Sequence, residues 1–263
     1  MLDILIKSGI QLTNGKIAIP NHCNRAAIDV GLGNGANQSQ RWLIEDENLF
    51  VIGFEPVSEN IESIVSGQFL NSKTQTALDP KYINDRFILI KCALSSKINA
   101  KGQEIYVTRW PTFGNSSLLF PKHFSVEHIE VVPVWTLEYF LENYFPFEKI
   151  SMIEHLKSDT QGSDFEVIKG AGTYISKIAA ITVELDNYAY HDTSNSLKRV
   201  TSYLKKFGFF KYCESKGKKS MNLNMFLLKL LKIKLSVDTK DPVYLNKHLL
   251  KNFKQDTLKV HVV

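Results

Sequence analysis

A glycine-rich segment that begins with an acid is the first candidate for chemistry along the chain. Residues 29–35 read DVGLGNG and lie between a short apolar run and a segment with a helical pattern. Glycines at a strand-to-helix turn permit tight backbone conformations and let a ligand approach the backbone closely. Glu55 ends the next apolar run, 20 residues after Gly35, and a carboxylate there can accept hydrogen bonds from both hydroxyls of a ribose. This pairing predicts a site for a nucleoside-containing cofactor.

Two classes of cofactor fit this glycine spacing. Gly31 and Gly33 with Ala36 match the G-x-G-x-x-G/A fingerprint of dinucleotide-binding proteins, so an NAD(P)-dependent oxidoreductase is one alternative. Asp29 stands two residues before the first glycine, and a carboxylate there matches a pyrophosphate poorly. It suits a cofactor that carries an ammonium and a sulfonium and no phosphate. S-adenosyl-L-methionine has those features, and we favour it.

A second group of polar residues follows the fourth predicted sheet strand, at 150–157. Asp159 comes directly after that strand and is our first candidate to contact or deprotonate a substrate. In an extended chain His155, Lys157 and Asp159 share one face. Lys157 either takes part in this chemistry or is the structural ion-pair partner of an acid, and both interpretations stay open. We expect His155 to be a hydrogen-bonded core residue.

Acids, tyrosines and a histidine gather after the fifth predicted strand, in the segment 184–192 (ELDNYAYHD). His191 is an alternative general base to Asp159. A Mg²⁺ ion bound through oxygen by Asp159, Glu184 and Asp186 is a further hypothesis. Acids scattered along a chain in this way seldom form a metal site, however, and we expect no metal.

The elements that position these residues alternate along the chain. Nearly unbroken apolar runs are typical of parallel strands covered by helices on both faces, and amphipathic segments lie between them. Strands are predicted at 26–30, 49–54, 87–92, 105–108, 150–157, 178–185, 209–213 and 222–228. Helices are predicted at 37–48, 59–70, 136–144, 164–169 and 196–207. The order indicates an α/β protein with a mostly parallel sheet.

The composition is that of one globular domain. The chain has 263 residues, of which 44% are apolar and 22% are charged, and this excludes disordered, collagenous and disulfide-stapled proteins. No Pro/Gly/Ser-rich linker divides it. We therefore expect a single domain over 1–263, with a lead-in at 1–25 and an irregular insert at 95–133 that shapes the substrate site.

The charge is distributed unevenly. Residues 201–263 carry 14 Lys and no Arg against 4 Asp/Glu, whereas the first 200 residues have 18 basic and 23 acidic side chains. Aromatic and basic residues do not interleave regularly in this basic part, so we expect a solvated surface and no nucleic-acid partner. Its longest apolar stretch, 225–235, contains three lysines and is shorter than the roughly 20 residues of a membrane span. Together with an N-terminus that lacks the features of a secretory signal, this predicts a cytoplasmic protein without a transmembrane segment.

Six motifs follow one another in the first two thirds of the chain. They are DVGLGNG at 29–35, FEP at 54–56, ALSS at 93–96, SSL at 116–118, VWTL at 134–137, and KSDTQGSD at 157–164 continuing to KGA at 169–171. In this order they resemble the motifs of FkbM-family methyltransferases. The glycine motif is common to all class I methyltransferases, whereas the Lys-x-Asp-x-x-Gly segment followed by Gly-Ala is much more diagnostic of the family.

The resemblance implies a fold and an activity. The fold is a Rossmann-like seven-stranded sheet, mostly parallel, with helices on both faces and an antiparallel last strand supplied by the basic part at 201–263. The activity is transfer of a methyl group from S-adenosyl-L-methionine to a hydroxyl of a sugar, glycan or secondary metabolite. The expected partner is therefore a small-molecule or glycan acceptor. A catalytically silent Rossmann-like binding module is a further alternative.

Site residues can be carried over from the family by position. The resemblance implies that Glu55 holds the ribose and that Ala93 and Leu94 lie near the adenine. It also implies that the methionine part of the cofactor is lined by Asp29, Gly31, Gly33 and Gly35.

Three residues in the diagnostic segment depart from the family's pattern. Gln161 and Asp164 stand where many members have Glu, and Ser158 replaces an apolar residue. The candidate catalytic residues remain Asp159, His191 and Lys157.

Overall fold

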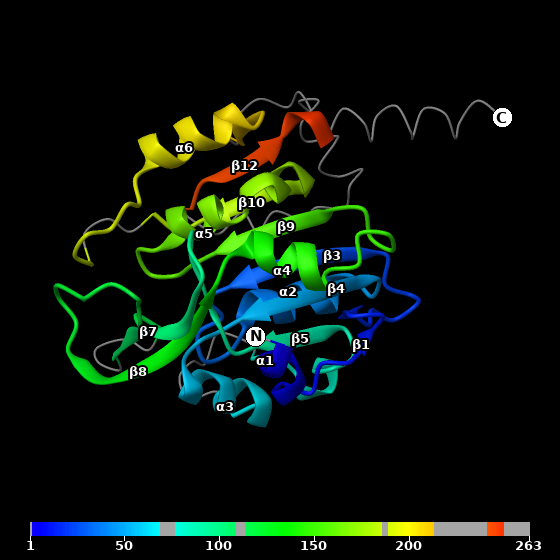
Figure 1. The fold of residues 1–263 in the computed structure, drawn as a ribbon, viewed down its shortest axis with the longest axis horizontal. Helices are drawn as coiled ribbons and strands as arrows, with labels where there is room; N and C mark the ends of the chain where they lie inside the picture. The colour runs from blue at the N-terminus through cyan, green and yellow to red at the C-terminus, as the bar shows by residue number, and fades with distance from the viewer. Residues whose placement is uncertain (1, 69–76, 109–113, 186–188, 213–240, 250–263) are drawn as a thin grey trace.

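A seven-stranded sheet is the centre of the part of the chain that the computed structural model describes, residues 2–68, 77–108, 114–185, 189–212 and 241–249 (Figure 1). Its strands stand in the order β11-β12-β10-β9-β3-β4-β5. They are Phe209–Tyr212 (β11), Val243–Asn246 (β12), Ile178–Val183 (β10), Ile153–Ser158 (β9), Arg25–Val30 (β3), Leu49–Phe54 (β4) and Phe87–Ile90 (β5). The strands from β10 to β5 pair in parallel, and β12 pairs antiparallel with β10 and β11. This confirms the expected mostly parallel sheet with an antiparallel last strand.

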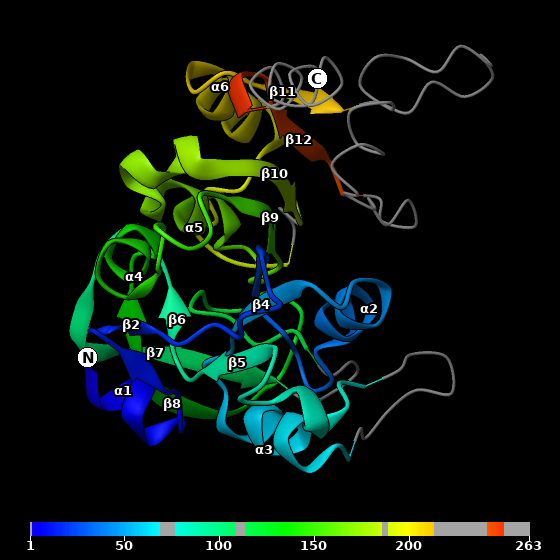
Figure 2. The ribbon, with the colours of Figure 1, turned by 90° about the vertical axis from the view of Figure 1, so that its right-hand side faces the viewer.

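Helices cover both faces of this sheet. On one face α2 (Asn37–Glu45) and α3 (Ser58–Ser66) bury apolar side chains such as Trp42 and Ile64 against Val51 of β4. The other face is covered by α1 (Leu2–Lys7), α4 (Leu137–Tyr144), α5 (Asp164–Gly170) and α6 (Leu197–Lys206). Figure 2 shows α2 and α4 on opposite sides of the sheet. No helix in the described part of the chain combines the length and the apolar character that a membrane crossing requires.

The apolar runs predict the parallel strands well and the ends of the chain poorly. β4 coincides with the predicted strand at 49–54, because both faces of this strand are buried. The predicted strand at 222–228 lies outside the described residues, and the antiparallel strand of the sheet is β12. Helix α1 and the short antiparallel pair β1 (Leu12–Thr13) and β2 (Lys16–Ile17) were not predicted.

The segment 95–133, expected to be irregular, contains most of a second sheet. β7 (Asn99–Thr108) pairs antiparallel with β8 (Val126–Trp135), and β6 (Ala93–Leu94) pairs parallel with β8. The sequence predicts only the last four residues of β7 and no strand at β8, which contains Pro133, a residue that cannot donate a backbone hydrogen bond. Pro133 is tolerated beside a shift in register between Asn99 and Gln103, where the regular pairing is interrupted.

Strand register brings the candidate residues to one edge of the central sheet. Asp29 of β3 lies directly opposite Gly53 of β4 on one side and Lys157 of β9 on the other. The loops that follow β3, β4, β9 and β10 all start at the carboxyl ends of parallel strands, which is where open α/β sheets bind their ligands. The glycine-rich segment, Glu55 and Asp159 therefore meet although the chain separates them widely.

Candidate active site

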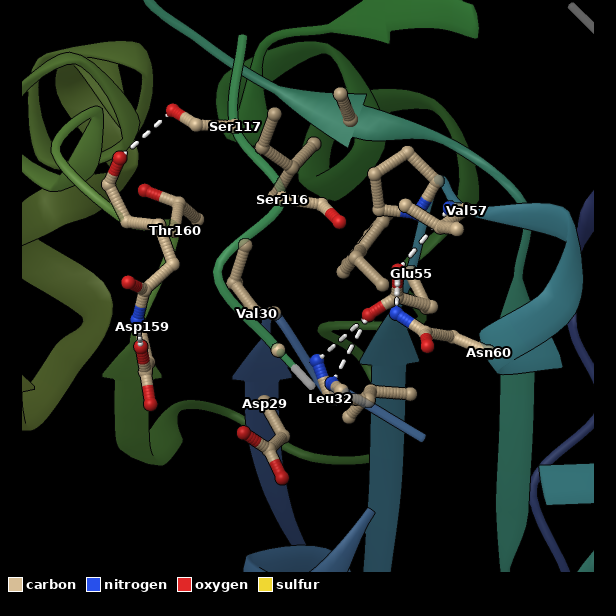
Figure 3. Close-up of a pocket in the computed structure, with 18 of the residues that line it drawn as sticks. Asp29, Val30, Leu32, Glu55, Val57, Asn60, Ser116, Ser117, Asp159 and Thr160 are labelled. Atoms are coloured by element: carbon tan, nitrogen blue, oxygen red, sulfur yellow. Dashed lines mark hydrogen bonds between the residues drawn. The ribbon is translucent and has the colours of Figure 1, made fainter. Parts of the chain in front are cut away.

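A cavity of about 500 Å³ opens at the carboxyl ends of the central strands (Figure 3). One wall consists of the glycine-rich segment after β3, Glu55 after β4, and the residues of β6. A second wall consists of residues 114–118 and 159–161. The volume lies in the range of small-molecule and cofactor sites, roughly 300–1,000 Å³. The cavity can therefore hold a cofactor and part of a second reactant.

The glycine-rich segment turns tightly against the loop that follows β9. Gly31 has a φ of 77°, and a Cβ at this residue would lie 1.9 Å from the carbonyl oxygen of Asp159. The two loops touch backbone to backbone, and the Asp159 N–H donates to the carbonyl oxygen of Val30 at 3.0 Å. Gly33 has a φ of 59° and lines the cavity, and a Cβ there would meet nothing within 4 Å. Gly31 is thus required for close approach, whereas Gly33 leaves open space toward the cavity.

Glu55 ties the glycine-rich segment to the end of β4 (Figure 3). Its Oε2 accepts hydrogen bonds from the N–H groups of Leu32 and Gly33 at 3.1 and 3.0 Å. Its Oε1 accepts from the N–H of Val57 at 3.0 Å and from Asn60 Nδ2 at 3.1 Å. Burial raises the pKa of Glu55 to about 7, although these four donors favour the ionised form. The carboxylate therefore shapes the glycine turn as well as lining the cavity.

Lys157 lies between two acids at the edge of the cavity. Its Nζ is 3.4 Å from Asp29 Oδ1 and 3.4 Å from Asp159 Oδ2, and it donates to the carbonyl oxygen of Gly31 at 3.3 Å. The other oxygen of Asp29 accepts from Ser39 Oγ at 2.7 Å. Burial favours the neutral amine, but the charges of Asp29 and Asp159 outweigh it and raise the pKa of Lys157. Lys157 therefore stays protonated, as a fixed positive charge and not as a proton acceptor.

Asp159 is the acid of this group that is accessible from the cavity. Its side chain is 34% exposed, against 1% for Asp29. Burial acts to raise the pKa of Asp159, but the charge of Lys157 and hydrogen bonds from Glu184 and Gln161 hold it below the usual value. Burial and the neighbouring charge of Asp159 raise the pKa of Glu184. The two shifts thus have opposite directions, which favours the negative charge on Asp159 and the proton on Glu184.

Comparison with known proteins places this site within a protein family. A family model described as the methyltransferase FkbM domain matches residues 29–211. The chain belongs to the FkbM methyltransferase family. The match runs from the end of β3 into β11 and includes all the cavity residues described above, so the family resemblance of the sequence motifs is confirmed.

A solved structure described as "Structure of an antibiotic related Methyltransferase" is similar over 85% of this chain and 87% of that chain, with 14% sequence identity and a TM-score of 0.34. No curated protein matches the chain. The match over 29–211 shows the FkbM family, and the strand order of the central sheet shows the fold.

Two residues that depart from the family's pattern contact each other in this FkbM domain. Ser158 Oγ donates to Asp164 Oδ1 at 2.6 Å. The same oxygen accepts from the N–H and the hydroxyl of Thr160, at 2.7 and 3.0 Å, and Oδ2 accepts from Asn195 Nδ2 at 2.8 Å. Burial raises the pKa of Asp164, and these bonds oppose the effect. The Ser158–Asp164 pair therefore fixes the loop that carries Asp159.

The residues that the family resemblance places around the cofactor do not all reach the cavity. Ala93 and Leu94 line it, as do Asp29, Gly31, Gly33 and Glu55. Gly35 is not among its lining residues, and the carbonyl oxygen of Gly35 accepts a hydrogen bond from the N–H of Leu78 at 2.8 Å. Gly35 thus connects the glycine-rich segment to Leu78 and does not line the cavity.

The two histidines singled out from the sequence are not among the residues that line the cavity of the FkbM domain. His191 is exposed, its ring centroid is 6.0 Å from that of Phe120, and it is not among the residues that line the cavity. The structure therefore does not place His191 as a base. His155 is a core residue, as expected: its Nε2 lies 2.8 Å from Thr182 Oγ1, and burial lowers its pKa to about 4.

The cavity of the FkbM domain also contains polar side chains that were not predicted as site residues. Asn34 Nδ2 is buried and has no hydrogen-bond partner among the described residues. Ser117 Oγ donates to the carbonyl oxygen of Gln161 at 2.7 Å. Asn34 lies in the DVGLGNG motif and Ser117 in the SSL motif. Their position in these motifs is the sequence signal that could have identified them as site residues. Asn60, in the first turn of α3, carries no such signal.

The structure offers no metal site in its described part. Within those residues no group of three or more His, Cys, Asp or Glu side chains is arranged so that it could hold an ion. Asp186, one member of the hypothetical Mg²⁺ set, lies outside the described residues. Asp159 and Glu184 both accept hydrogen bonds from Gln161 Nε2, at 2.8 and 2.6 Å.

Proposed function

We propose that this FkbM domain is an S-adenosyl-L-methionine-dependent O-methyltransferase that acts on a hydroxyl of a small-molecule or glycan acceptor. The observation that supports it is one cavity lined by two carboxyl groups in different environments. Glu55 is buried and bonded to the glycine turn, whereas Asp159 is ionised and accessible. Methyl transfer from a nucleoside cofactor to an alcohol needs both an acceptor for the ribose hydroxyls and a base for the alcohol within one site. Glu55 supplies the first and Asp159 the second.

The residues around the cavity fit S-adenosyl-L-methionine. Asp29 and Asp159 outweigh the single positive charge of Lys157 between them, and the net negative charge suits an ammonium and a sulfonium. Asn34 Nδ2 is a buried donor without a partner in the described part of the chain, and it suits the carboxylate of a methionine moiety. Glu55 lines the cavity, and its carboxylate would receive ribose hydroxyls in exchange for part of the four donors that it now accepts from, since a carboxylate has about four acceptor positions.

The wall formed by the glycine-rich segment argues against a dinucleotide. In dinucleotide-binding folds the backbone N–H groups of the glycine turn face the pyrophosphate. Here the N–H groups of Leu32 and Gly33 already donate to Glu55, and Asp29 adds a second acid behind the turn. A pyrophosphate would meet negative charge in place of donors. We therefore do not favour the NAD(P)-dependent oxidoreductase that the glycine spacing also allows.

The contribution of the chain to the reaction is to align the acceptor and to take its proton. S-adenosyl-L-methionine supplies a methyl group on a positively charged sulfur, which retains the electron pair of the old bond as the acceptor oxygen forms the new one. Alignment in one site can provide an effective molarity of about 10⁵–10⁸ M. Asp159 accepts the hydroxyl proton as general base, which typically contributes about 10²–10⁴-fold, and Lys157 keeps Asp159 ionised until then.

Calorimetric titration with S-adenosyl-L-methionine and S-adenosyl-L-homocysteine tests the cofactor assignment. We expect saturable binding to the wild-type protein. Glu55→Ala should weaken it at least about tenfold, because a charge-assisted hydrogen bond contributes about 1.5–3 kcal/mol. The matched control is Glu62→Ala, because Glu62 is an exposed acid in α3, the helix that follows Glu55. This variant should bind the cofactor as the wild type does. A well-folded wild-type protein that binds neither compound would contradict the proposal.

Cofactor affinity should depend on pH through Glu55. Its pKa is raised to about 7, so the carboxylate that accepts hydrogen bonds is present above that pH and is lost as the pH falls through it. We expect the affinity for S-adenosyl-L-homocysteine to decrease as the pH is lowered from about 8 to about 6. Glu55→Gln cannot titrate and should show weaker affinity with no such decrease. Equal pH profiles for the two proteins would remove Glu55 as the titrating group.

A further inference from the structure

Gln161 lines the cavity and lies between the carboxyl groups of Asp159 and Glu184. Its Nε2 donates to Asp159 Oδ1 at 2.8 Å and to Glu184 Oε2 at 2.6 Å. The two carboxyl groups are close enough that each shifts the pKa of the other. Both protons of one amide are therefore used to hold this pair of carboxyl groups.

The orientation of this amide is set from its other end. The Tyr190 hydroxyl, on a fully buried side chain, lies 2.9 Å from Gln161 Oε1 and 2.9 Å from the carbonyl oxygen of Asn115, and its proton is shared between these acceptors. Because a tyrosine hydroxyl in this place donates, the oxygen of the amide faces Tyr190 and the nitrogen faces the acids. Ser117 Oγ holds the backbone of the same residue through the Gln161 carbonyl oxygen.

The backbone at Gln161 adopts a conformation that glycine favours. Its φ is 55°, and it is followed by Gly162 with a φ of 99°. A residue with a side chain in the left-handed region costs about 1–2 kcal/mol. Such a conformation persists where the surroundings over-determine it. Here the contacts that do so are those to Tyr190, Ser117 and the two acids.

The charges around the pair decide which carboxyl group is ionised. The charged groups that face it are Lys157 of β9, Asp29 of β3, Asp164 of α5 and Asp241 before β12. Lys157 is an ion-pair partner of Asp159. Burial, Asp159, Asp164 and Asp241 all act to raise the pKa of Glu184. Burial and Asp159 likewise raise the pKa of Asp241, to about 6. The negative charge therefore belongs on Asp159.

We propose that Gln161 is a positioning residue for methyl transfer: its amide holds the carboxyl groups of Asp159 and Glu184 together and keeps Asp159 at the cavity wall, ready to accept the proton of the acceptor hydroxyl. This inference rests on the proposed function in one respect, namely that Asp159 is the base. A Glu at position 161 has nearly the same shape but brings a third carboxyl group into the cluster. The amide itself, and not a side chain of that size, is therefore what Asp159 requires.

Carboxyl-carbon NMR titration tests this without knowledge of the acceptor. The protein is labelled with ¹³C at Asp Cγ and Glu Cδ, and the signals of Asp159 and Glu184 are assigned with Asp159→Asn and Glu184→Gln. We expect Gln161→Glu to raise the pKa of Asp159 by about one unit or more. Gln161→Gly, which suits the positive φ and removes the amide, should raise it as well and serves if the first variant does not fold.

A matched control separates the local effect from added charge in the cavity. Gln38→Glu introduces a carboxyl group at another lining residue of the cavity, in helix α2. This variant should leave the Asp159 pKa within about 0.3 units of the wild-type value. The proposal is overturned if folded Gln161→Glu and Gln161→Gly also stay within that range.

Calorimetry with S-adenosyl-L-methionine on the wild-type protein and the same variants separates this inference from the proposed function. A shifted Asp159 titration in variants of a wild-type protein that binds no cofactor supports the role of Gln161 in the cluster and contradicts the proposed function. Cofactor binding by the wild-type protein with an unshifted titration in both variants does the reverse.

Discussion

Replacing Asp159 by Asn is expected to lower kcat for methyl transfer about 10²–10⁴-fold. The amide has nearly the same shape as the carboxylate but cannot accept the hydroxyl proton. The rest of the site should persist, because Lys157 keeps Asp29 as an ion-pair partner at 3.4 Å. The rate is measured as release of S-adenosyl-L-homocysteine with a mixture of sugars and polyols as acceptors, at saturating S-adenosyl-L-methionine, so that a weaker cofactor affinity does not enter kcat.

His191→Ala is the matched control for the Asp159 variant. His191 is the other base that the sequence offers, but it is exposed and does not line the cavity. We expect its replacement to leave the rate unchanged. A His191→Ala protein that loses activity while Asp159→Asn retains it would show that the base has been assigned to the wrong residue.

Gly31→Ala is expected to have the largest effect on the architecture of the site. At a φ of 77° an alanine is disfavoured by about 1–2 kcal/mol, and its Cβ would lie 1.9 Å from the oxygen and 2.8 Å from the carbon of the Asp159 carbonyl. Backbone atoms cannot rotate away, so the loops after β3 and β9 must separate. We expect a loss of about 2–5 kcal/mol in the free energy of unfolding, measured with urea, and cofactor affinity reduced about 100-fold or more.

Gly33→Ala is the control for the conformational part of that loss. Its φ of 59° is also in the left-handed region, but a Cβ would meet nothing within 4 Å. The free energy of unfolding should therefore fall only by the conformational cost, about 1–2 kcal/mol. If the two alanine variants unfold at the same urea concentration, close approach between the two loops is not the reason for glycine at position 31.

The central strands can be predicted from the sequence because a parallel strand buried on both faces has an unbroken run of apolar residues. β4 at Leu49–Phe54 is such a run and matches the prediction at both ends. β12 at Val243–Asn246 is different, since it follows a lysine-rich stretch and is defined by its pairing with β10 and β11. A strand whose identity depends on distant partners leaves little local signal.

The residues of the site are predictable to the extent that strand ends determine them. Glu55 and Asp159 follow directly from the rule that carboxyl ends of parallel strands meet at one edge. Their roles do not follow, because Glu55 bonds to backbone N–H groups 22 and 23 residues earlier in the chain. Likewise, nothing in the spacing says that Glu184 keeps the proton that Asp159 loses. His191 shows the converse, a suitable side chain in a loop that leads away from the cavity.

The departures from the family's pattern become intelligible only as contacts. Ser158 and Asp164 are separate differences in the sequence, but a 2.6 Å hydrogen bond joins them. Both side chains are buried, and each is a hydrogen-bond partner of the other. Gln161, the third departure, bonds to both acids of the pair. A single sequence can mark such residues as unusual, whereas their geometry is required to explain them.

A crystal structure of the protein with S-adenosyl-L-homocysteine tests the central claim most directly. The account predicts that the ribose hydroxyls lie within hydrogen-bond distance of the Glu55 carboxylate and that the sulfur faces the part of the cavity into which Asp159 opens. A nucleoside bound away from Glu55, or a sulfur that faces away from Asp159, would contradict it.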